Sequence, residues 1–290
     1  MKLVKTISEV RAEVGRARSS GRSIGLVPTM GFLHEGHLSL ADRCCELAGY
    51  VVMSIYVNPL QFGPSEDFDE YPRALERDLA LAEERGVDLV FAPADRELYP
   101  TELTVTVAPR RLADRLCGLS RPGHFEGVLT VVGKLFGIVQ PDLAVFGQKD
   151  FQQAVLIQKM VIDLDMPVRV EVAPTVREAD GIAMSSRNEY LSADERRRAL
   201  SISRGLAGAL RSFRSGERDA AMIGRGVLQT MEEAGGVDVE YVEVVSADDL
   251  EPVQQADEET VVVVAARVGT TRLIDNARLG APDPGLARLL

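Results

Sequence analysis

The feature that most constrains the fold is an alternation, over the first 177 residues, of short apolar runs with longer segments of helical spacing. The apolar runs are rich in Val, Ile and Leu and are bounded by Gly, Pro or Asn, which is typical of buried strands. They stand at residues 24–30, 51–59, 87–93, 141–147 and 168–176. Apolar residues recur at helical spacing in segments 37–48, 71–86, 125–140 and 151–165. This alternation favours parallel strands joined by crossover helices, so we predict a doubly wound α/β sheet.

The pattern changes after residue 177. A charged, Arg-rich and Ala-rich region at 194–235 predicts helix, and the segments 238–246, 260–269 and 270–279 predict a small antiparallel sheet. We therefore expect two domains, residues 1–177 and a smaller α+β domain of residues 178–290. Because ligand sites often lie at domain junctions, we expect the second domain to close over a site carried by the first.

Charge and hydropathy narrow the classes of protein. The 290 residues include 33 Lys and Arg against 44 Asp and Glu, a formal net charge of -11. Nucleic-acid binding depends on neutralising phosphates with basic side chains, so this balance disfavours it. No run reaches the roughly 18 to 20 apolar residues of a membrane span, and the charged, helix-like N-terminus lacks a signal-peptide core. We expect a cytoplasmic protein without a membrane partner.

Cysteine usage agrees with a reducing compartment. The three cysteines, Cys44, Cys45 and Cys117, are odd in number and lack the spacing of zinc ligands. We expect reduced thiols, and no flanking motif supports a catalytic one.

The stretch PTMGFLHEGHLSL at residues 28–40 is the first candidate for chemistry. Pro28 and Gly31 end a predicted strand, and His34 and His37 stand where the next helix begins. Helix N-termini favour anions, so two imidazoles there indicate a phosphate site. Polar loop histidines are the plainer alternative, and a metal site would need a third ligand that is not apparent.

Polar residues also follow later strands. YVNPLQFG places Asn58 and Gln61 beside Phe62 at a strand end, although Asn-Pro can simply make a turn. FGQKDFQQ places Lys149 at a strand end with Asp150 as a possible helix cap and Gln153 one turn on. The plainer alternative is a cap with an exposed lysine.

The loop AMSSRNEYLS adds Ser185, Ser186 and Arg187, which are good triphosphate ligands, or else a plain Ser-rich turn. Neither G-x-x-x-x-G-K-[ST] nor G-x-G-x-x-G occurs, so a P-loop kinase and a dinucleotide dehydrogenase are not indicated.

Together these segments resemble the pantothenate synthetase family, which has a Rossmann-like sheet of the class I aminoacyl-tRNA synthetase and nucleotidylyltransferase type. The resemblance rests on VPTMGFLHEGHLSL, YVNPLQFG, YPR, RPGHFEGV, FGQKDFQQ, PTVREADGIAMSSRNEYLS and TTRLIDN. It implies that ATP and pantoate give pantoyl-adenylate and pyrophosphate, after which β-alanine displaces AMP to give pantothenate. It also implies magnesium with the ATP, since Mg²⁺ offsets triphosphate charge, and a homodimer.

The resemblance further implies roles for individual residues. Gln61 and Gln153 would hold pantoate, with Asn58 lining the same pocket, and Asp78 is a candidate magnesium ligand. His37, the candidate proton donor, and His34, Lys149, Ser185, Ser186 and Arg187 would be catalytic. The implied ATP contacts are Met30, Gly31, Phe32, Leu33, His34, Glu35, Gly36, His37, Gly147, Gln148, Lys149, Asp150, Val176, Met184, Ser185, Ser186 and Arg187.

Two positions depart from the family pattern. Gln148 stands where many relatives have an acidic residue, and Glu126 stands where a basic or small residue is common. Neither is an expected catalytic residue. Three alternatives stay open: an adenylyltransferase of the same superfamily, a tRNA-binding synthetase fragment, and a nucleotide sensor without activity. The net charge argues against the tRNA-binding fragment, and retention of His34, His37 and Lys149 together argues against the sensor.

Overall fold

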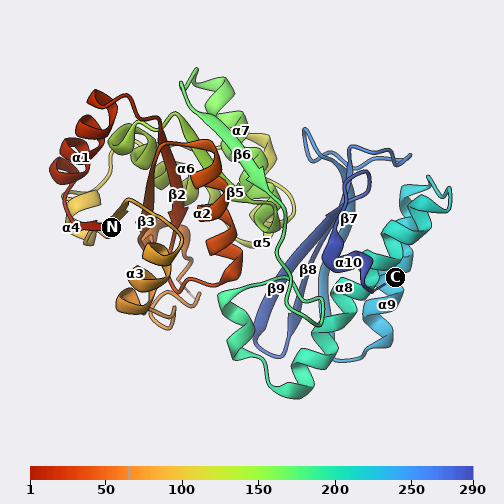
Figure 1. Ribbon diagram of the computed structural model, residues 1–290. Helices are drawn as coiled ribbons and strands as arrows, with labels where there is room; N and C mark the ends of the chain where they lie inside the picture. Colours follow the sequence, from red (N-terminus) through yellow and green to blue (C-terminus); the bar gives the residue numbers. More distant parts are fainter. Residues whose placement is uncertain (65, 290) are drawn as a thin grey trace. The chain divides into compact units, whose positions relative to one another are not determined.

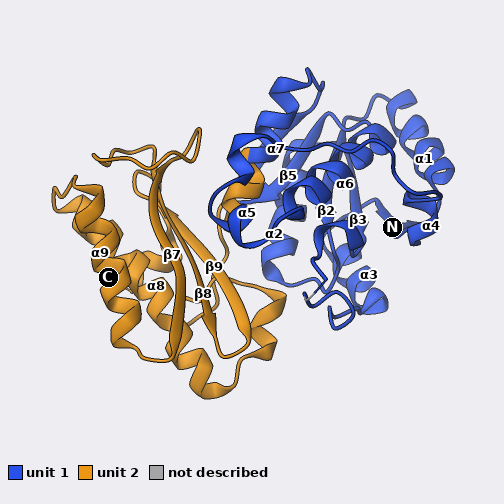
Figure 2. Cartoon of the chain, turned by 180° about the vertical axis from the view of Figure 1, so that it is seen from behind, with its two compact units in different colours: residues 1–147, 156–173 blue, residues 148–155, 174–290 orange. Residues whose placement is uncertain are grey.

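The computed structural model describes residues 1–64 and 66–289, and the chain forms two compact units (Figure 2). Unit 1 comprises Met1–Gly147 and Leu156–Ala173, and unit 2 comprises Gln148–Val155 together with the chain from Pro174 onward. One helix, Phe151–Asp163, therefore has residues in both units. A division into domains at residue 177 stays a prediction.

Unit 1 is built on a six-stranded sheet in which every neighbouring pair of strands is parallel (Figure 1). Its order is β1-β4-β3-β2-β5-β6, which confirms the predicted α/β class. The strands are β1 (Lys2–Val4), β2 (Ile24–Thr29), β3 (Tyr50–Ile55), β4 (Leu89–Phe91), β5 (Leu143–Gly147) and β6 (Arg169–Ala173). The sequence did not predict β1, because three residues are too few to show a periodic pattern.

Helices cover the sheet of unit 1. They are α1 (Ile7–Ser19), α2 (Glu35–Leu47), α3 (Leu75–Glu84), α4 (Asp95–Leu98), α5 (Cys117–Ser120), α6 (His124–Val139) and α7 (Phe151–Asp163). Helix α2 packs on β3 and β5, where Leu38 and Cys44 join Val27 and Met53 in one buried cluster. Successive side chains of a strand alternate between faces, so the equally buried Leu26 faces the opposite layer. Helices α1 and α6 pack together and contact β2.

The strand order locates the edge where ligands are expected. From β2 the chain proceeds to β3 and β4 on one side, whereas β5 and β6 are added on the other side. Strands β2 and β5 are therefore neighbours at a switch point, with Gly25 opposite Leu143. In open α/β sheets, ligands bind beyond the carboxyl ends of such strands. Here those ends are Thr29 and Gly147, each followed by a predicted site segment.

Unit 2 contains a three-stranded antiparallel sheet, β7 (Val237–Ser246), β8 (Thr260–Val268) and β9 (Thr271–Arg278), as predicted. The expected helical region is two helices, α8 (Ala193–Arg214) and α9 (Ala220–Glu233), and a short α10 (Pro284–Ala287) follows the sheet. The helices and the sheet share one buried cluster. No helix within residues 1–64 or 66–289 has the length and apolar character needed to cross a membrane.

Candidate active site

The predicted histidine element connects β2 to α2. His34 is the N-cap of α2, with an extended backbone at φ −138° and ψ 173°. Its Nδ1 accepts a hydrogen bond from the Gly36 N–H at 3.1 Å, and Nδ1 of His37 accepts from the His34 N–H at 3.4 Å. The ring centroids lie 4.0 Å apart. The two imidazoles thus cap the helix reciprocally, as Ser and Glu do in a capping box.

This geometry determines what the rings can offer to a ligand. A ring nitrogen that accepts a hydrogen bond carries no proton, so each neutral imidazole must carry its proton on Nε2. Both Nε2–H groups are then donors, and they stand at the positive end of a 13-residue helix. Such an arrangement suits the oxygens of a phosphate.

Two consecutive residues with left-handed backbone lead into the histidine element. Gly31 has a φ of +84° and Phe32 has a φ of +51°, which costs energy for a residue other than glycine. Asp78 of α3 stabilises this turn by accepting hydrogen bonds from the N–H groups of Phe32 at 2.7 Å and Leu33 at 2.8 Å. The Arg77 guanidinium lies 5.2 Å from the centre of the Phe32 ring. Helix α3 thereby holds the turn that presents the histidines.

These contacts bear on the expected magnesium ligand. Asp78 is only 1% exposed, and both of its oxygens accept main-chain N–H groups. An anchoring role fits this environment, whereas a magnesium ligand needs an oxygen that reaches the ion. Across the two described stretches, 1–64 and 66–289, no group of three or more His, Cys, Asp or Glu side chains could hold a metal ion.

Replacing Asp78 with asparagine tests the anchoring role. The new amide nitrogen would face a main-chain N–H, so one hydrogen bond is lost and a buried donor is left unpaired. We expect the free energy of unfolding to fall by about 1–3 kcal/mol in urea titrations. Glu76→Gln, at an exposed position in the first turn of the same helix, is the matched control and should leave it unchanged. Equal stability of the two variants would contradict the anchoring role.

The predicted amides Asn58 and Gln61 come together near the carboxyl end of β3. Asn58 is 1% exposed, and its Nδ2 donates to the Gly127 carbonyl at 3.1 Å and to Oε1 of Gln61 at 3.3 Å. Its Oδ1 accepts from the Tyr99 hydroxyl at 2.8 Å. Nε2 of Gln61 in turn lies 2.9 Å from Sδ of Met30. The Asn58 amide therefore makes its hydrogen bonds to other residues of the protein, and it orients Gln61 beside Met30, the residue that follows β2.

The close packing of this segment explains why residue 127 is a glycine. Residues Pro59–Gln61 form the 3-10 turn η1, which packs against α6. A Cβ at Gly127 of α6 would overlap the main-chain carbonyl of Leu60. Only glycine lets the helix approach η1 closely enough for the Gly127 carbonyl to accept from Asn58.

A polar network that the sequence did not indicate fixes Gln61 from its other side. Nδ1 of His124 lies 2.8 Å from the Gln61 carbonyl, and Nη1 of Arg121 lies 3.0 Å from Nε2 of His124. A carbonyl only accepts and a guanidinium only donates, so His124 carries its proton on Nδ1. Arg121 also makes a two-pronged ion pair with Glu66, at 2.8 and 2.5 Å. Arg121 lies 55 residues from Glu66 and His124 lies 63 residues from Gln61, so no local sequence pattern indicates these contacts.

The Glu66 carboxyl responds to this pairing. Partial burial would raise its pKa, but the hydrogen bond and the charge of Arg121 outweigh burial, so the pKa lies below 4.5. Because the folded-state pKa is depressed, the ion pair contributes its full stabilisation of the folded state above about pH 4.5. That contribution is lost as pH falls through the lowered pKa.

We therefore expect acid to release the segment around Glu66. Hydrogen exchange by mass spectrometry, corrected for intrinsic rates, should show residues 59–64 and 66–74 losing protection as pH falls below about 4.5. Glu66→Gln should show the unprotected behaviour already at neutral pH. Glu70→Gln, an exposed neighbour, serves as the control and should follow the wild type. Acid-independent protection in the wild type would argue against an anchoring role for this ion pair.

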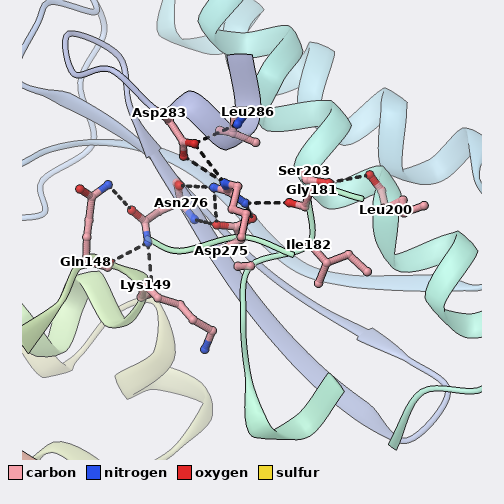
Figure 3. A network of polar contacts seen from close by, with 12 residues as sticks. Gln148, Lys149, Gly181, Ile182, Leu200, Ser203, Asp275, Asn276, Asp283 and Leu286 are labelled. Carbon is pink, nitrogen blue, oxygen red and sulfur yellow. Dashed lines mark hydrogen bonds and ion pairs between the residues drawn. The ribbon is translucent and has the colours of Figure 1, made fainter. Parts of the chain in front are cut away.

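Unit 2 carries the remaining predicted residues except Gly147, which ends β5. Gln148–Asp150 form the 3-10 turn η3, and Gln153 lies in the first turn of α7. Lys149 and Gln153 are half-buried, and Asp150 is exposed. The Asn276 side chain of β9 contacts the main chain of η3, and the Lys149 side chain extends away from it (Figure 3).

The predicted serine and arginine loop follows a short hairpin. The Met184 N–H donates to the Val176 carbonyl at 2.9 Å, which joins the two ends of the hairpin. Ser185 caps the 3-10 turn η4 (Ser186–Tyr190), its Oγ accepting from the Arg187 N–H at 3.3 Å. The structure therefore brings Val176 and the segment from Met184 to Arg187 together.

A buried arginine inside this hairpin was not predicted either. The Arg177 side chain is 2% exposed and pairs with Asp275 at 2.6 and 3.0 Å and with Asp283 at 3.0 Å. It also donates to the Gly181 carbonyl at 3.2 Å. Burial alone would lower the pKa of Arg177, but the two carboxylates outweigh it and raise the pKa. Arg177 thus stays charged and ties the hairpin to β9 and to the residue before α10.

Comparison with known proteins gives consistent matches along the chain. A family described as Pantoate-beta-alanine ligase matches residues 2–278. A pantothenate synthetase from Pelotomaculum thermopropionicum is 55% identical over 280 residues, covering 97% of this chain and 99% of the relative. One from Moorella thermoacetica is 52% identical, covering 98% of this chain and all of the relative.

Solved structures agree with the sequence comparison. Pantothenate synthetase from Thermus thermophilus has a TM-score of 0.92 and 42% identity, covering 96% of this chain and 99% of that one. Pantoate-beta-alanine ligase from Francisella tularensis, complexed with beta-gamma ATP and beta-alanine, has a TM-score of 0.76 and 30% identity, covering 97% and 99%.

Proposed function

The chain belongs to the pantoate-beta-alanine ligase family, and from that premise we propose how its residues carry the reaction. It is an ATP-dependent ligase that condenses pantoate with β-alanine to give pantothenate, AMP and pyrophosphate, through a pantoyl-adenylate intermediate. The observation that carries this assignment is the 55% identity over 97% of the chain to a pantothenate synthetase.

In this reaction the substrates form and break the bonds between themselves, and the main task of the protein is to stabilise the charge that develops. A free carboxylate is a poor acyl donor, so the pantoate carboxylate attacks the α-phosphorus of ATP and pyrophosphate leaves. Negative charge builds up on the phosphates in that step, and fixed donors stabilise it. The Nε2–H groups of His34 and His37 are suited to this task, with His37 as the proton donor. The β-alanine amine then attacks the carbonyl carbon and AMP leaves.

Four further residues belong to the proposed ATP contacts. Lys149, Ser185, Ser186 and Arg187 supply further positive charge and donors to the phosphates. The buried Ser186 and the cap at Ser185 support a preformed loop there. The remaining proposed ATP contacts are Met30, Gly31, Phe32, Leu33, Glu35, Gly36, Gly147, Gln148, Asp150, Val176 and Met184, with Gly147 and Asp150 beside the ribose.

Gln61 and Gln153 are the proposed pantoate ligands, since neutral amides hydrogen-bond both hydroxyl and carboxylate groups. Asn58 supports this pocket by fixing Gln61, which its hydrogen bonds favour over direct contact with the substrate.

Magnesium, location and assembly complete the proposal. We propose that Mg²⁺ arrives bound to the ATP phosphates, where it offsets their charge, because Asp78 does not fit as its ligand. The number and spacing of the three cysteines, which favour reduced thiols, and the need for ATP support a cytoplasmic protein. A homodimer, expected from the family resemblance, is testable by light scattering.

Pyrophosphate release tests the function. ATP and Mg²⁺ with pantoate should release pyrophosphate, and adding β-alanine should give sustained turnover with AMP and pantothenate. A panel of other small hydroxy acids is the control. Equal pyrophosphate release with every acid would contradict the assignment of pantoate as the substrate and would leave only an adenylating enzyme whose substrate is another acid.

Two substitutions test the proposed charge stabilisation. We expect His37→Ala and Lys149→Ala each to lower the rate of adenylation by about 100-fold, because each removes a positive group or donor used in the transition state. Circular dichroism should show that both variants fold. Wild-type rates from folded variants would defeat the assignment.

A further inference from the structure

One buried side chain in unit 2 holds the main chain on both sides of Lys149. Asn276 of β9 is 1% exposed. Its Nδ2 donates to the Gln148 carbonyl at 2.9 Å and to the Lys149 carbonyl at 3.1 Å. Those carbonyls belong to the two peptide groups that flank the Lys149 Cα, so one amide restricts the backbone on either side of that residue (Figure 3).

The orientation of the Asn276 amide follows from its partners. Main-chain carbonyls only accept, so the nitrogen of the amide must face them and the oxygen must face the other way. That oxygen accepts from Nε2 of Gln148 at 3.1 Å. A glutamate at position 148 would instead bring an oxygen against an oxygen. Gln148, the departure from the family pattern in this motif, is therefore the matching partner of Asn276.

The strand also fixes Asn276 itself. Its N–H donates to Oδ1 of Asp275 at 2.7 Å, and its carbonyl accepts from Arg177 at 3.4 Å. The side chain that restrains η3 thus stands on a rigid support, while the Lys149 side chain extends away from it (Figure 3). A charged group needs such support to act at one place, because a displacement of about 1 Å can cost on the order of 100-fold in rate.

We propose that Asn276 is a positioning residue for Lys149, holding the η3 backbone so that the ammonium group stands ready for the triphosphate, with Gln148 orienting the Asn276 amide. The proposal rests on the role given to Lys149 above. It predicts that Asn276 affects adenylation, in which pyrophosphate leaves, and not the later attack of β-alanine on the adenylate.

The test is a double-mutant cycle with Asn276→Ala, Lys149→Ala and the double variant. Single-turnover pyrophosphate release should fall about tenfold or more in Asn276→Ala, yet less than about twofold further when Lys149 is already alanine. Equal fold losses in the two backgrounds would overturn the proposal, since they would show an effect independent of Lys149. Arg278→Ala, two residues along β9, is the matched control and should stay within about twofold of the wild type.

A second readout separates positioning from general damage. With prepared pantoyl-adenylate and β-alanine, Asn276→Ala should form pantothenate within about twofold of the wild-type rate. A comparable loss in both half-reactions would overturn the proposal. Asn276→Asp, which keeps the shape but replaces Nδ2 by an oxygen, should reproduce the adenylation loss and serves if the alanine variant does not fold.

The outcomes also distinguish this proposal from the proposed function. If the wild type releases no pyrophosphate with pantoate, both the proposed function and the proposed role of Asn276 are wrong. If the wild type reacts and Lys149→Ala is impaired, but Asn276 variants keep the wild-type rate, only the positioning role falls.

Discussion

The arrangement of unit 2 depends on the ion pairs of one buried guanidinium group, that of Arg177. Burying a charge is costly unless it is paired and hydrogen-bonded, and Arg177 meets both conditions through Asp275, Asp283 and the Gly181 carbonyl. The pairing joins a hairpin to a strand and to the start of a short helix, which lie 98 and 106 residues further along the sequence. Because Asn276 follows Asp275 directly, adjacent residues of one strand restrain two different site segments. The position of η3 is thus tied to the same strand that compensates the buried charge.

Both units restrain their loops in the same physical way. Segments that leave a strand end expose N–H and C=O groups that need partners, and a buried or half-buried polar side chain from a distant element supplies them. Asp78 accepts hydrogen bonds from the N–H groups of Phe32 and Leu33. His124 donates to the Gln61 carbonyl. Asn276 donates to the carbonyls of Gln148 and Lys149. The residues proposed to touch ligand are therefore held through their main chain by residues that are not proposed to touch it.

This division explains what could be predicted from the sequence. Strands β2 to β6 follow from β-branched runs and α2 from periodicity, and the location of His34 at a helix start follows from both. The fold class, the family and the substrates were predicted correctly because their signals lie in local segments. The restraining residues give no such signal. Asn276 is 128 residues from Gln148, and Asp78 is 46 residues from Phe32, so only the folded chain brings them together. The strand β1 was missed because it is too short to show a pattern.

The division of α7 between the two units has a consequence for synthesis of the chain. Residues Gln148–Val155 belong to unit 2, although they leave the ribosome before the last strand of unit 1. Their partner on β9 emerges 128 residues later, which at elongation rates of about 5 to 20 residues per second corresponds to about 6 to 25 s. During that interval the main chain around Lys149 lacks Asn276. On the proposal above, the nascent chain acquires a restrained Lys149 only after residue 276 has been synthesised, and a product that ends before this residue would retain the histidine element without that restraint.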